Sequence, residues 1–296
     1  LSATAPPDYG MWAGSKMVHA SLFLLAVGRS GRERKTTATA KPREMLFHVN
    51  PFLLGPRPGS AAGLHESLTK RPKQALFYDE FGDFLAGTGD ANTRLLKMTL
   101  NQAYDGNIEA TTLAKKATKD GFQDHDRGEV RNVRLTICAA CSLSYIETLV
   151  RQEDWRGGFM RRWIILMAKR GPIKVDPPAR LDLKERAIAR LRITHDRTLG
   201  RCEGIDPEVA SAWEQWSRYI DEELKLPNLI ESASSSMPEM ARRIALCLSL
   251  DYGLATTGEP WRMGLDVLKP ATAIVQYGHA ESIQELSEHI DDHEDG

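Results

Sequence analysis

The sequence predicts an α/β fold in which a mostly parallel sheet is flanked by helices and is followed by a C-terminal helical domain. Two observations lead to this prediction. Short apolar, β-leaning runs alternate with helix-like segments through the first half of the chain, as expected for parallel strands covered on both faces. Beyond a proline-rich stretch, apolar residues recur at helical spacing. With 296 residues, the chain is long enough to bury a full core.

Changes in composition divide the chain into four parts. Residues 1–17 open with a proline- and alanine-rich stretch and are interpreted as a tail or the remnant of a preceding region. Residues 18–170 form the predicted α/β core, into which residues 107–134 are inserted as a basic hairpin. Residues 171–205 begin with three closely spaced prolines and are predicted to be a linker. Residues 206–296 form the helical domain, whose acidic end from Glu281 is expected to be solvated and frayed.

Four apolar runs predict the core strands, at His19–Val27, Gln74–Tyr78, Leu135–Cys141 and Trp163–Met167. Helical periodicity predicts helices at Lys35–Met45, Ala61–Thr69, Thr93–Tyr104 and Tyr145–Gln152, and in the C-terminal third at 206–226, 238–252 and 265–286. Pro42 lies inside the first of these helices. Because proline removes a backbone donor, we expect it to end or kink that helix early.

Charge and hydropathy exclude some classes of protein. The net charge is −1, so any contact with nucleic acid must come from a local basic patch. The longest apolar stretch, Val18–Val27, is interrupted by polar residues and is too short to cross a bilayer. The first residues also lack the pattern of a secretory signal. We therefore expect a soluble, cytoplasmic protein that does not bind a membrane.

A glycine-rich turn with the sequence VGRSGRERKTT follows the first predicted strand and leads into the first helix. Backbone N–H groups and a lysine in such a strand, loop and helix can hold phosphates. The candidate nucleotide ligands are Gly28, Ser30, Gly31, Arg34, Lys35, Thr36 and Thr37. Lys35 would reach the β- and γ-phosphates during catalysis, and Thr36 would contribute to a Mg²⁺ shell.

The turn departs from the G-x-x-x-x-G-K-[ST] pattern. Gly28 lies seven residues before Lys35, where the pattern has six, and Arg34 occupies the position of the second glycine. An arginine-rich surface turn is therefore the alternative interpretation.

Asp79 and Glu80 end the second predicted strand, in the sequence ALFYDE. Adjacent carboxylates at the end of a strand point to different faces, so that one can bind a metal while the other faces a nucleophile. Asp79 is the candidate Mg²⁺ ligand, and Glu80 is the candidate base that activates water. The alternative is a strand that simply stops at two solvated acids.

Three further sets of residues are candidates for function. Ser142 ends the third predicted strand, where a small polar side chain could sense a γ-phosphate or hold the attacking water. Arg161 and Arg162 follow a Gly-Gly turn, and one of them could stabilise transition-state charge across a subunit boundary. The inserted hairpin carries Lys115, Lys116 and Lys119, which could contact phosphates of nucleic acid. Ordinary surface roles are the alternatives for all three sets.

The order of these motifs resembles the P-loop ATPases of phage and mobile-element replication proteins, which are often joined to primase domains. The resemblance rests on VGRSGRERKTT, ALFYDEFGDFL, the Asp105-Gly106 segment, LTICAACS and GGFMRRW. It implies a P-loop NTPase core of the AAA+ or RecA-like kind that assembles into a homo-oligomeric ring and acts in DNA unwinding or replication initiation. The basic hairpin is similar in position to the DNA-tracking hairpins of hexameric helicases.

The leading hypothesis is thus an oligomeric ATPase that uses Mg²⁺ and ATP as a helicase-like motor on DNA, preferably single-stranded, with a primase domain or partner. A second hypothesis is a nucleotide-dependent scaffold or switch that binds ATP with little turnover, which the irregular loop favours. A third is an α/β module in which the glycine turn has no role in nucleotide binding.

Overall fold

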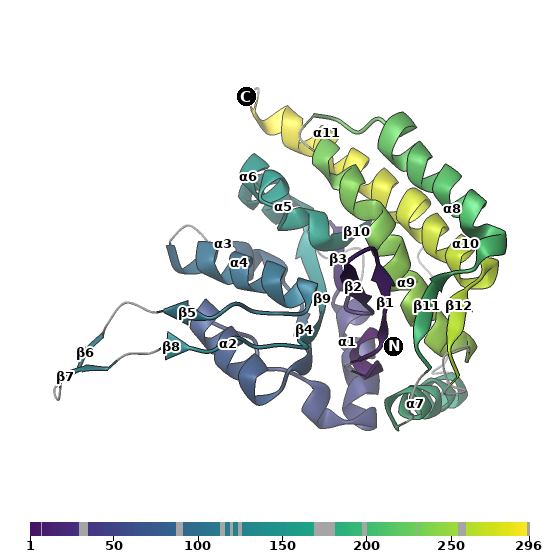
Figure 1. The fold of residues 1–296 in the computed structure, drawn as a ribbon. Helices are drawn as coiled ribbons and strands as arrows, with labels where there is room; N and C mark the ends of the chain where they lie inside the picture. Colours follow the sequence, from purple (N-terminus) through teal and green to yellow (C-terminus); the bar gives the residue numbers. More distant parts are fainter. Residues whose placement is uncertain are drawn as a thin grey trace.

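The computed structural model describes residues 1–294 except 7, 30–34, 87–90, 113–115, 119–120, 124–125, 169–180, 197–199, 229 and 254–258. Its central feature is a four-stranded sheet with the order β10-β3-β9-β4 (Figure 1). All neighbouring strands in it are parallel. The strands are β3 (Phe23–Gly28), β4 (Lys73–Tyr78), β9 (Arg134–Ser142) and β10 (Trp163–Met167).

The sequence of the middle strand explains why the sheet is covered on both faces. In β9 the consecutive residues Ala139, Ala140 and Cys141 are all almost inaccessible, although they alternate between the two faces. The helices around the sheet are α1 (Lys35–Val49), α2 (Ala61–Lys70), α3 (Phe81–Ala86), α4 (Ala91–Asp105), α5 (Leu143–Leu149) and α6 (Gln152–Arg156). Helices α1, α3, α4 and α5 contact β9 directly. An α/β fold with a mostly parallel sheet flanked by helices is therefore confirmed.

The interpretation of residues 1–17 as a tail is wrong. They contain a short 3₁₀ helix (Ser2–Thr4) and the hairpin strands β1 (Gly10–Ala13) and β2 (Lys16–His19). Thr4, Tyr9 and Met11 are buried. The hairpin belongs to a second sheet, in the order β12-β11-β1-β2, with β11 (Cys202–Ile205) and β12 (Trp261–Met263). Residues distant in sequence thus supply the partners that stabilise this hairpin.

The predicted linker 171–205 is also partly wrong. Residues 171–180 lie outside the described part of the chain. From Leu181 onward, however, the segment forms α7 (Leu181–Asp196), which packs on α1, and then β11. The buried side chains of the C-terminal helices and of the central sheet form one continuous cluster.

The inserted segment 107–134 forms the predicted hairpin. Its base is an antiparallel bridge between Ile108 and Val130. Beyond the base, β5 (Thr111–Thr112) pairs with β8 (Asp126–Arg127), and β6 (Lys116–Thr118) pairs with β7 (Gly121–Gln123). In Figure 1, β6 and β7 lie well away from the body of the protein.

The C-terminal helices are α8 (Pro207–Arg218), α9 (Met237–Tyr252), α10 (Leu265–Ala273) and α11 (Glu281–Glu294). Turns of π-helix at Tyr219–Glu223 and Ile274–Ala280 extend α8 and join α10 to α11. The acidic segment from Glu281 forms α11, which buries Ile283 and Leu286 on its apolar face. No helix in the described ranges is long and apolar enough to cross a membrane.

Side chains from this C-terminal segment satisfy the outer side of β10, which is an edge strand. The Ile165 N–H donates to His279 Nδ1 at 3.0 Å, and the Met167 N–H donates to Ser282 Oγ at 2.9 Å. Unpaired donors on an edge strand invite pairing with another chain. The two side chains therefore close this edge of the sheet.

Most predicted elements occur near their predicted positions, with two differences in the N-terminal half. The run His19–Val27 is not one strand, because β2 ends at His19 and β3 begins at Phe23. Pro42 does not end α1, which continues to Val49. Packing of α1 against the sheet and against α7 outweighs the loss of one backbone hydrogen bond.

The contact between His279 and β10 predicts acid sensitivity. Burial lowers the pKa of His279 to about 4, and a neutral ring is needed to accept the Ile165 N–H. Below pH 6.5 the unfolded chain binds a proton that the folded state excludes, so stability falls as the pH drops toward 4. We expect His279 to contribute a loss of roughly 3 kcal/mol over this range. Urea unfolding at a series of pH values measures it.

Two variants separate this effect from general acid denaturation. His279→Gln keeps an acceptor for the Ile165 N–H but cannot titrate. The slope of the free energy of unfolding against pH should therefore decrease by an amount that corresponds to at most one bound proton. His48→Gln removes an exposed histidine and should leave the pH dependence as in the wild type. An unchanged slope in His279→Gln would contradict the assignment.

Candidate functional site

The strand order creates a point on one side of the central sheet where the connections between strands run in opposite directions. From β3 the chain crosses to β4, and β9 then inserts between them. From β9 the chain crosses in the other direction, past β3, to β10. The connections after β3 and β9 therefore diverge at the carboxyl ends of two adjacent strands. In open α/β sheets, ligands bind at such a point. We call the side of the sheet where Gly28, Tyr78 and Ser142 end their strands the carboxyl side.

The register brings the predicted motifs together there. Gly28 at the end of β3 pairs with Ser142 at the end of β9. Tyr78 at the end of β4 pairs with Ala139, so that Asp79 and Glu80 continue alongside the last residues of β9. The backbone N–H of Ser142 donates to Glu80 Oε1 at 3.2 Å. The ends of β4 and β9 are thus tied by the carboxylate of Glu80.

A glycine fixes the backbone directly after Glu80. Helix α3 begins at Phe81 and packs against α5. A Cβ atom added to Gly82 would lie only 2.5 Å from the ring of Tyr145 on α5. A side chain at this position would force the two helices apart and move Glu80 with them.

Asp79 is held by two neighbours. The buried hydroxyl of Thr39 on α1 donates to Asp79 Oδ1 at 3.1 Å. Arg57 Nη2 lies 3.4 Å from Asp79 Oδ2, while Arg57 Nε donates to the Phe77 carbonyl at 2.9 Å. About half of each side chain of this ion pair is exposed, 53% for Arg57 and 45% for Asp79. Such a pair contributes little to stability and opens easily.

The predicted nucleotide loop is described in part. Gly28 ends β3 on the carboxyl side, whereas Ser30, Gly31 and Arg34 lie outside the described residues. Lys35 and Thr36 form the start of α1, although their side chains are not among those described, and Thr37 is exposed. The N-terminus of this 15-residue helix therefore follows the end of β3 after a short connection. Its second turn contacts Asp79 through Thr39.

Arg161 and Arg162 do not join this group in their own chain. They form the 3₁₀ helix Met160–Arg162, directly before β10. β10 starts at Trp163, which pairs with Phe23 at the beginning of β3. The length of β3 places the two arginines roughly 16 Å from the carboxyl side. The predicted role of one of them across a subunit boundary stays a prediction.

Strands β6 and β7 of the hairpin lie away from the carboxyl side of the sheet (Figure 1). Lys116 is in β6, but its side chain is not described, and Lys115 and Lys119 lie outside the described residues. Figure 1 places β6 away from the sheet, so the hairpin cannot contribute to the same site within the chain.

Two residues of the site were missed by sequence reasoning. Thr39 could have been found, because it follows Lys35 by one helical turn and so lies on the same face of α1. Arg57 gave no such signal. It comes from the proline-rich connection before α2, and only the tertiary fold brings it to Asp79.

The side chains here fit a hard cation better than a soft one. Apart from the Arg57 guanidinium, the groups at this place are the Asp79 carboxylate and the Thr39 hydroxyl, whose oxygens are of the type that Mg²⁺ prefers. Mg²⁺ bound to a nucleotide needs only one or two protein carboxylates. In the described part of the chain, no three His, Cys, Asp or Glu side chains come close enough to hold a metal by themselves. Asp79 with Thr36 therefore remains the candidate pair of metal ligands, with phosphate oxygens completing the shell.

Comparison with known proteins adds no family assignment: no protein-family model matches this chain, and no curated protein matches it.

Proposed function

We propose that this chain is a Mg²⁺-dependent ATPase that works as an oligomeric, helicase-like motor on DNA in the replication of a phage or mobile element. One observation carries the proposal. The helix that follows the glycine-rich turn and the acidic pair that ends β4 meet on the carboxyl side of a parallel sheet, joined by the Thr39–Asp79 hydrogen bond. This is where α/β proteins bind nucleotides.

The N-terminal end of α1 supports phosphate binding at this place. The first backbone N–H groups of a helix have no partners within the helix, and the helix dipole favours negative charge there. No acidic residue lies in the first turn of α1 to oppose an anion. Lys35, as the first residue of the helix, would add its positive charge to the same end.

The contacts of Asp79 and Glu80 suit them to different roles. Asp79 faces α1, where it would hold Mg²⁺ together with Thr36. A bound Mg²⁺ would neutralise charge on the phosphates. Glu80 uses one oxygen to accept the Ser142 N–H, which fixes its carboxylate and leaves the second oxygen to orient and deprotonate water. Ser142, at the end of β9, positions Glu80 through its backbone, and its hydroxyl would sense the γ-phosphate.

The hairpin supports the assignment to DNA. A basic, two-stranded projection that stands away from the body can reach a nucleic-acid backbone without covering the carboxyl side of the sheet (Figure 1). Contacts by Lys115, Lys116 and Lys119 would bind phosphates regardless of base sequence. A ring of subunits would bring several hairpins to one strand and would place Arg161 or Arg162 near a neighbour's nucleotide.

A second candidate function is a nucleotide-dependent switch with little turnover. Two observations favour it. Arg34 replaces the second glycine of the loop, and Arg57 pairs with the carboxylate that should bind Mg²⁺. If Arg57 stays on Asp79, the metal cannot bind there, and nucleotide binding would be coupled to the movement of Arg57.

Activity of two variants tests the catalytic assignment. We expect Glu80→Gln to lower kcat for ATP hydrolysis by about 10²- to 10⁴-fold, because the amide cannot accept a proton from water. Lys35→Ala should weaken ATP binding as well as hydrolysis. Phosphate release, measured with and without single-stranded DNA, gives both values. Glu214→Gln changes an exposed glutamate on α8 and is the control. Wild-type turnover in Glu80→Gln would remove Glu80 from the mechanism.

The position of Arg57 predicts an effect on the Mg²⁺ requirement. In Arg57→Gln, Asp79 loses a competing cation, so half-maximal ATP binding should need at least about twofold less Mg²⁺. The free energy of unfolding should change by less than about 1 kcal/mol, because the pair is exposed. Titration of Mg²⁺ at fixed ATP measures the first effect, and urea unfolding the second. Arg131→Gln removes a similar exposed pair with Glu129 and should leave the Mg²⁺ requirement unchanged.

Salt dependence tests the hairpin. Replacing Lys115, Lys116 and Lys119 with Ala should weaken single-stranded DNA binding and reduce the slope of log K against log salt by up to about 2, roughly 0.7 for each lost phosphate contact. ATP hydrolysis without DNA should stay at the wild-type rate. Fluorescence anisotropy with a labelled oligonucleotide over a salt series measures the slope. An unchanged slope would exclude these lysines from the DNA interface.

A further inference from the structure

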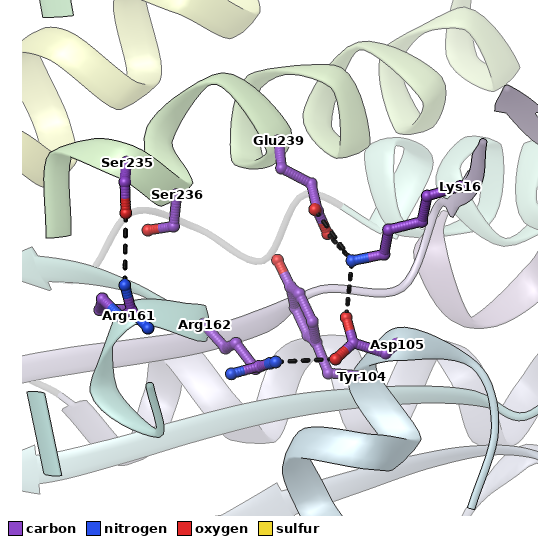
Figure 2. Close-up of a pocket in the computed structure, with 8 residues that line it drawn as sticks. All are labelled: Lys16, Tyr104, Asp105, Arg161, Arg162, Ser235, Ser236 and Glu239. Carbon is purple, nitrogen blue, oxygen red and sulfur yellow. Dashed lines mark hydrogen bonds and ion pairs between the residues drawn. The ribbon is translucent and has the colours of Figure 1, made fainter. Parts of the chain in front are cut away.

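A polar pocket lies on the amino side of the central sheet, opposite the carboxyl side. It has a volume of about 170 Å³. Figure 2 shows that its lining side chains converge from four separate parts of the chain: Lys16 on β2, Tyr104 and Asp105 at the end of α4, Arg161 and Arg162 before β10, and Ser235, Ser236 and Glu239 around the start of α9. Within one chain, the residues assigned to the nucleotide site on the carboxyl side do not line this pocket.

The two carboxylates of the pocket are already neutralised. Lys16 Nζ lies 2.8 Å from Asp105 and 3.1 Å from Glu239. Arg162 lies 2.7 Å from the other oxygen of Asp105. Glu239 is also paired at 2.7 Å with Arg243, whose side chain is completely buried behind the pocket. The pKa values of Asp105 and Glu239 are below their ordinary values, because these cations outweigh the effect of burial. Both acids are therefore charged and occupied.

Positive charge remains in excess. The group contains four cations, Lys16, Arg161, Arg162 and Arg243, against the two carboxylates. Arg161 has no carboxylate partner within the described residues. Arg161 Nη1 donates to neutral groups, the Ser235 hydroxyl at 3.3 Å and the Ser232 carbonyl at 3.5 Å. The Nε atoms of Arg161 and Arg162 are buried and have no hydrogen-bond partner. The excess of positive charge over carboxylate favours an anion in the pocket.

Tyr104 adds a hydroxyl group to the wall of the pocket. Only 4% of its surface is exposed, since its ring packs against Phe23 and lies beneath Arg243, 3.8 Å from the guanidinium carbon. Its hydroxyl points into the pocket and has no hydrogen-bond partner within the part of the chain that the structure describes (Figure 2). Burial raises the pKa of Tyr104 to about 12, so the hydroxyl keeps its proton. The hydroxyl can therefore donate a hydrogen bond to a ligand in the pocket.

We propose that this pocket binds a phosphate group. Arginine guanidinium groups match phosphate oxygens in pairs, and the donors here approach from several directions, which suits a tetrahedral anion better than a planar carboxylate. The volume is below that of pockets for whole drug-sized ligands, so the pocket takes a small anion or the phosphate end of a larger molecule. The proposal does not depend on ATP hydrolysis at the carboxyl side.

Calorimetric titration of inorganic phosphate tests it, at constant ionic strength with chloride as the balancing anion. The protein carries Lys35→Ala, so that the carboxyl side does not contribute. We expect saturable binding of one phosphate. Adding Tyr104→Phe should weaken this binding about tenfold, because it removes a single hydrogen bond to a charged group. The melting temperature should not fall, since that hydroxyl has no partner in the free protein.

Further variants and one competitor complete the test. Arg161→Ala should abolish phosphate binding, Arg161→Lys should restore part of it, and Arg156→Ala, which changes an exposed arginine on the preceding helix, should leave it unchanged. Competition by a single-stranded oligonucleotide would identify backbone phosphates as the source, and its absence would identify a small phosphate compound. No saturable binding, or equal binding by the parent, Tyr104→Phe and Arg161→Ala proteins, would overturn the proposal.

Discussion

The insertion of β9 between β3 and β4 is the constraint on which the rest of the structure depends. Because these strands run parallel and Gly28 is in register with Ser142, the segments that follow all three strands emerge together. The hydrogen bond from the Ser142 N–H to Glu80 then fixes the end of β4 against the end of β9. Without this strand, the acidic pair would have no fixed relation to the helix that follows the glycine-rich turn. The chemistry proposed for the carboxyl side follows from that geometry.

The amino side of the sheet is held by a different kind of interaction. Arg243 on α9 is fully buried and bonds to Glu239 and to the carbonyls of His19 and Ser21, so it joins α9 to the connection between β2 and β3. Removing one partner of such a buried pair costs about 3–5 kcal/mol. Ion pairs from Lys16 and Arg162 extend the network to α4 through Asp105. Charged side chains therefore organise the end of the sheet opposite the carboxyl side.

Local sequence predicted the core well and its surroundings poorly. Apolar periodicity predicted the strands β4, β9 and β10, the helices α2 and α4, and the hairpin. In each of these elements, the order of apolar and polar residues within the segment itself indicates which side chains are buried. The β1–β2 hairpin and α7 could not be predicted in this way, since their partners are distant in sequence: Met11 pairs with Cys202, and α7 packs on α1. In the candidate site, Asp79, Glu80 and Ser142 were identified because a polar residue at the end of an apolar run indicates the end of a strand. Arg57 was not, and the position of the Arg161–Arg162 pair depends on topology alone.

Crystals of the protein grown with Mn²⁺ in place of Mg²⁺ and a non-hydrolysable ATP analogue would test the central claim most directly, by the anomalous scattering of manganese. The account predicts one strong peak beside the carboxylate of Asp79, with the triphosphate between it and the first turn of α1. Analogue bound elsewhere in the molecule, or bound here with the manganese away from Asp79, would contradict it.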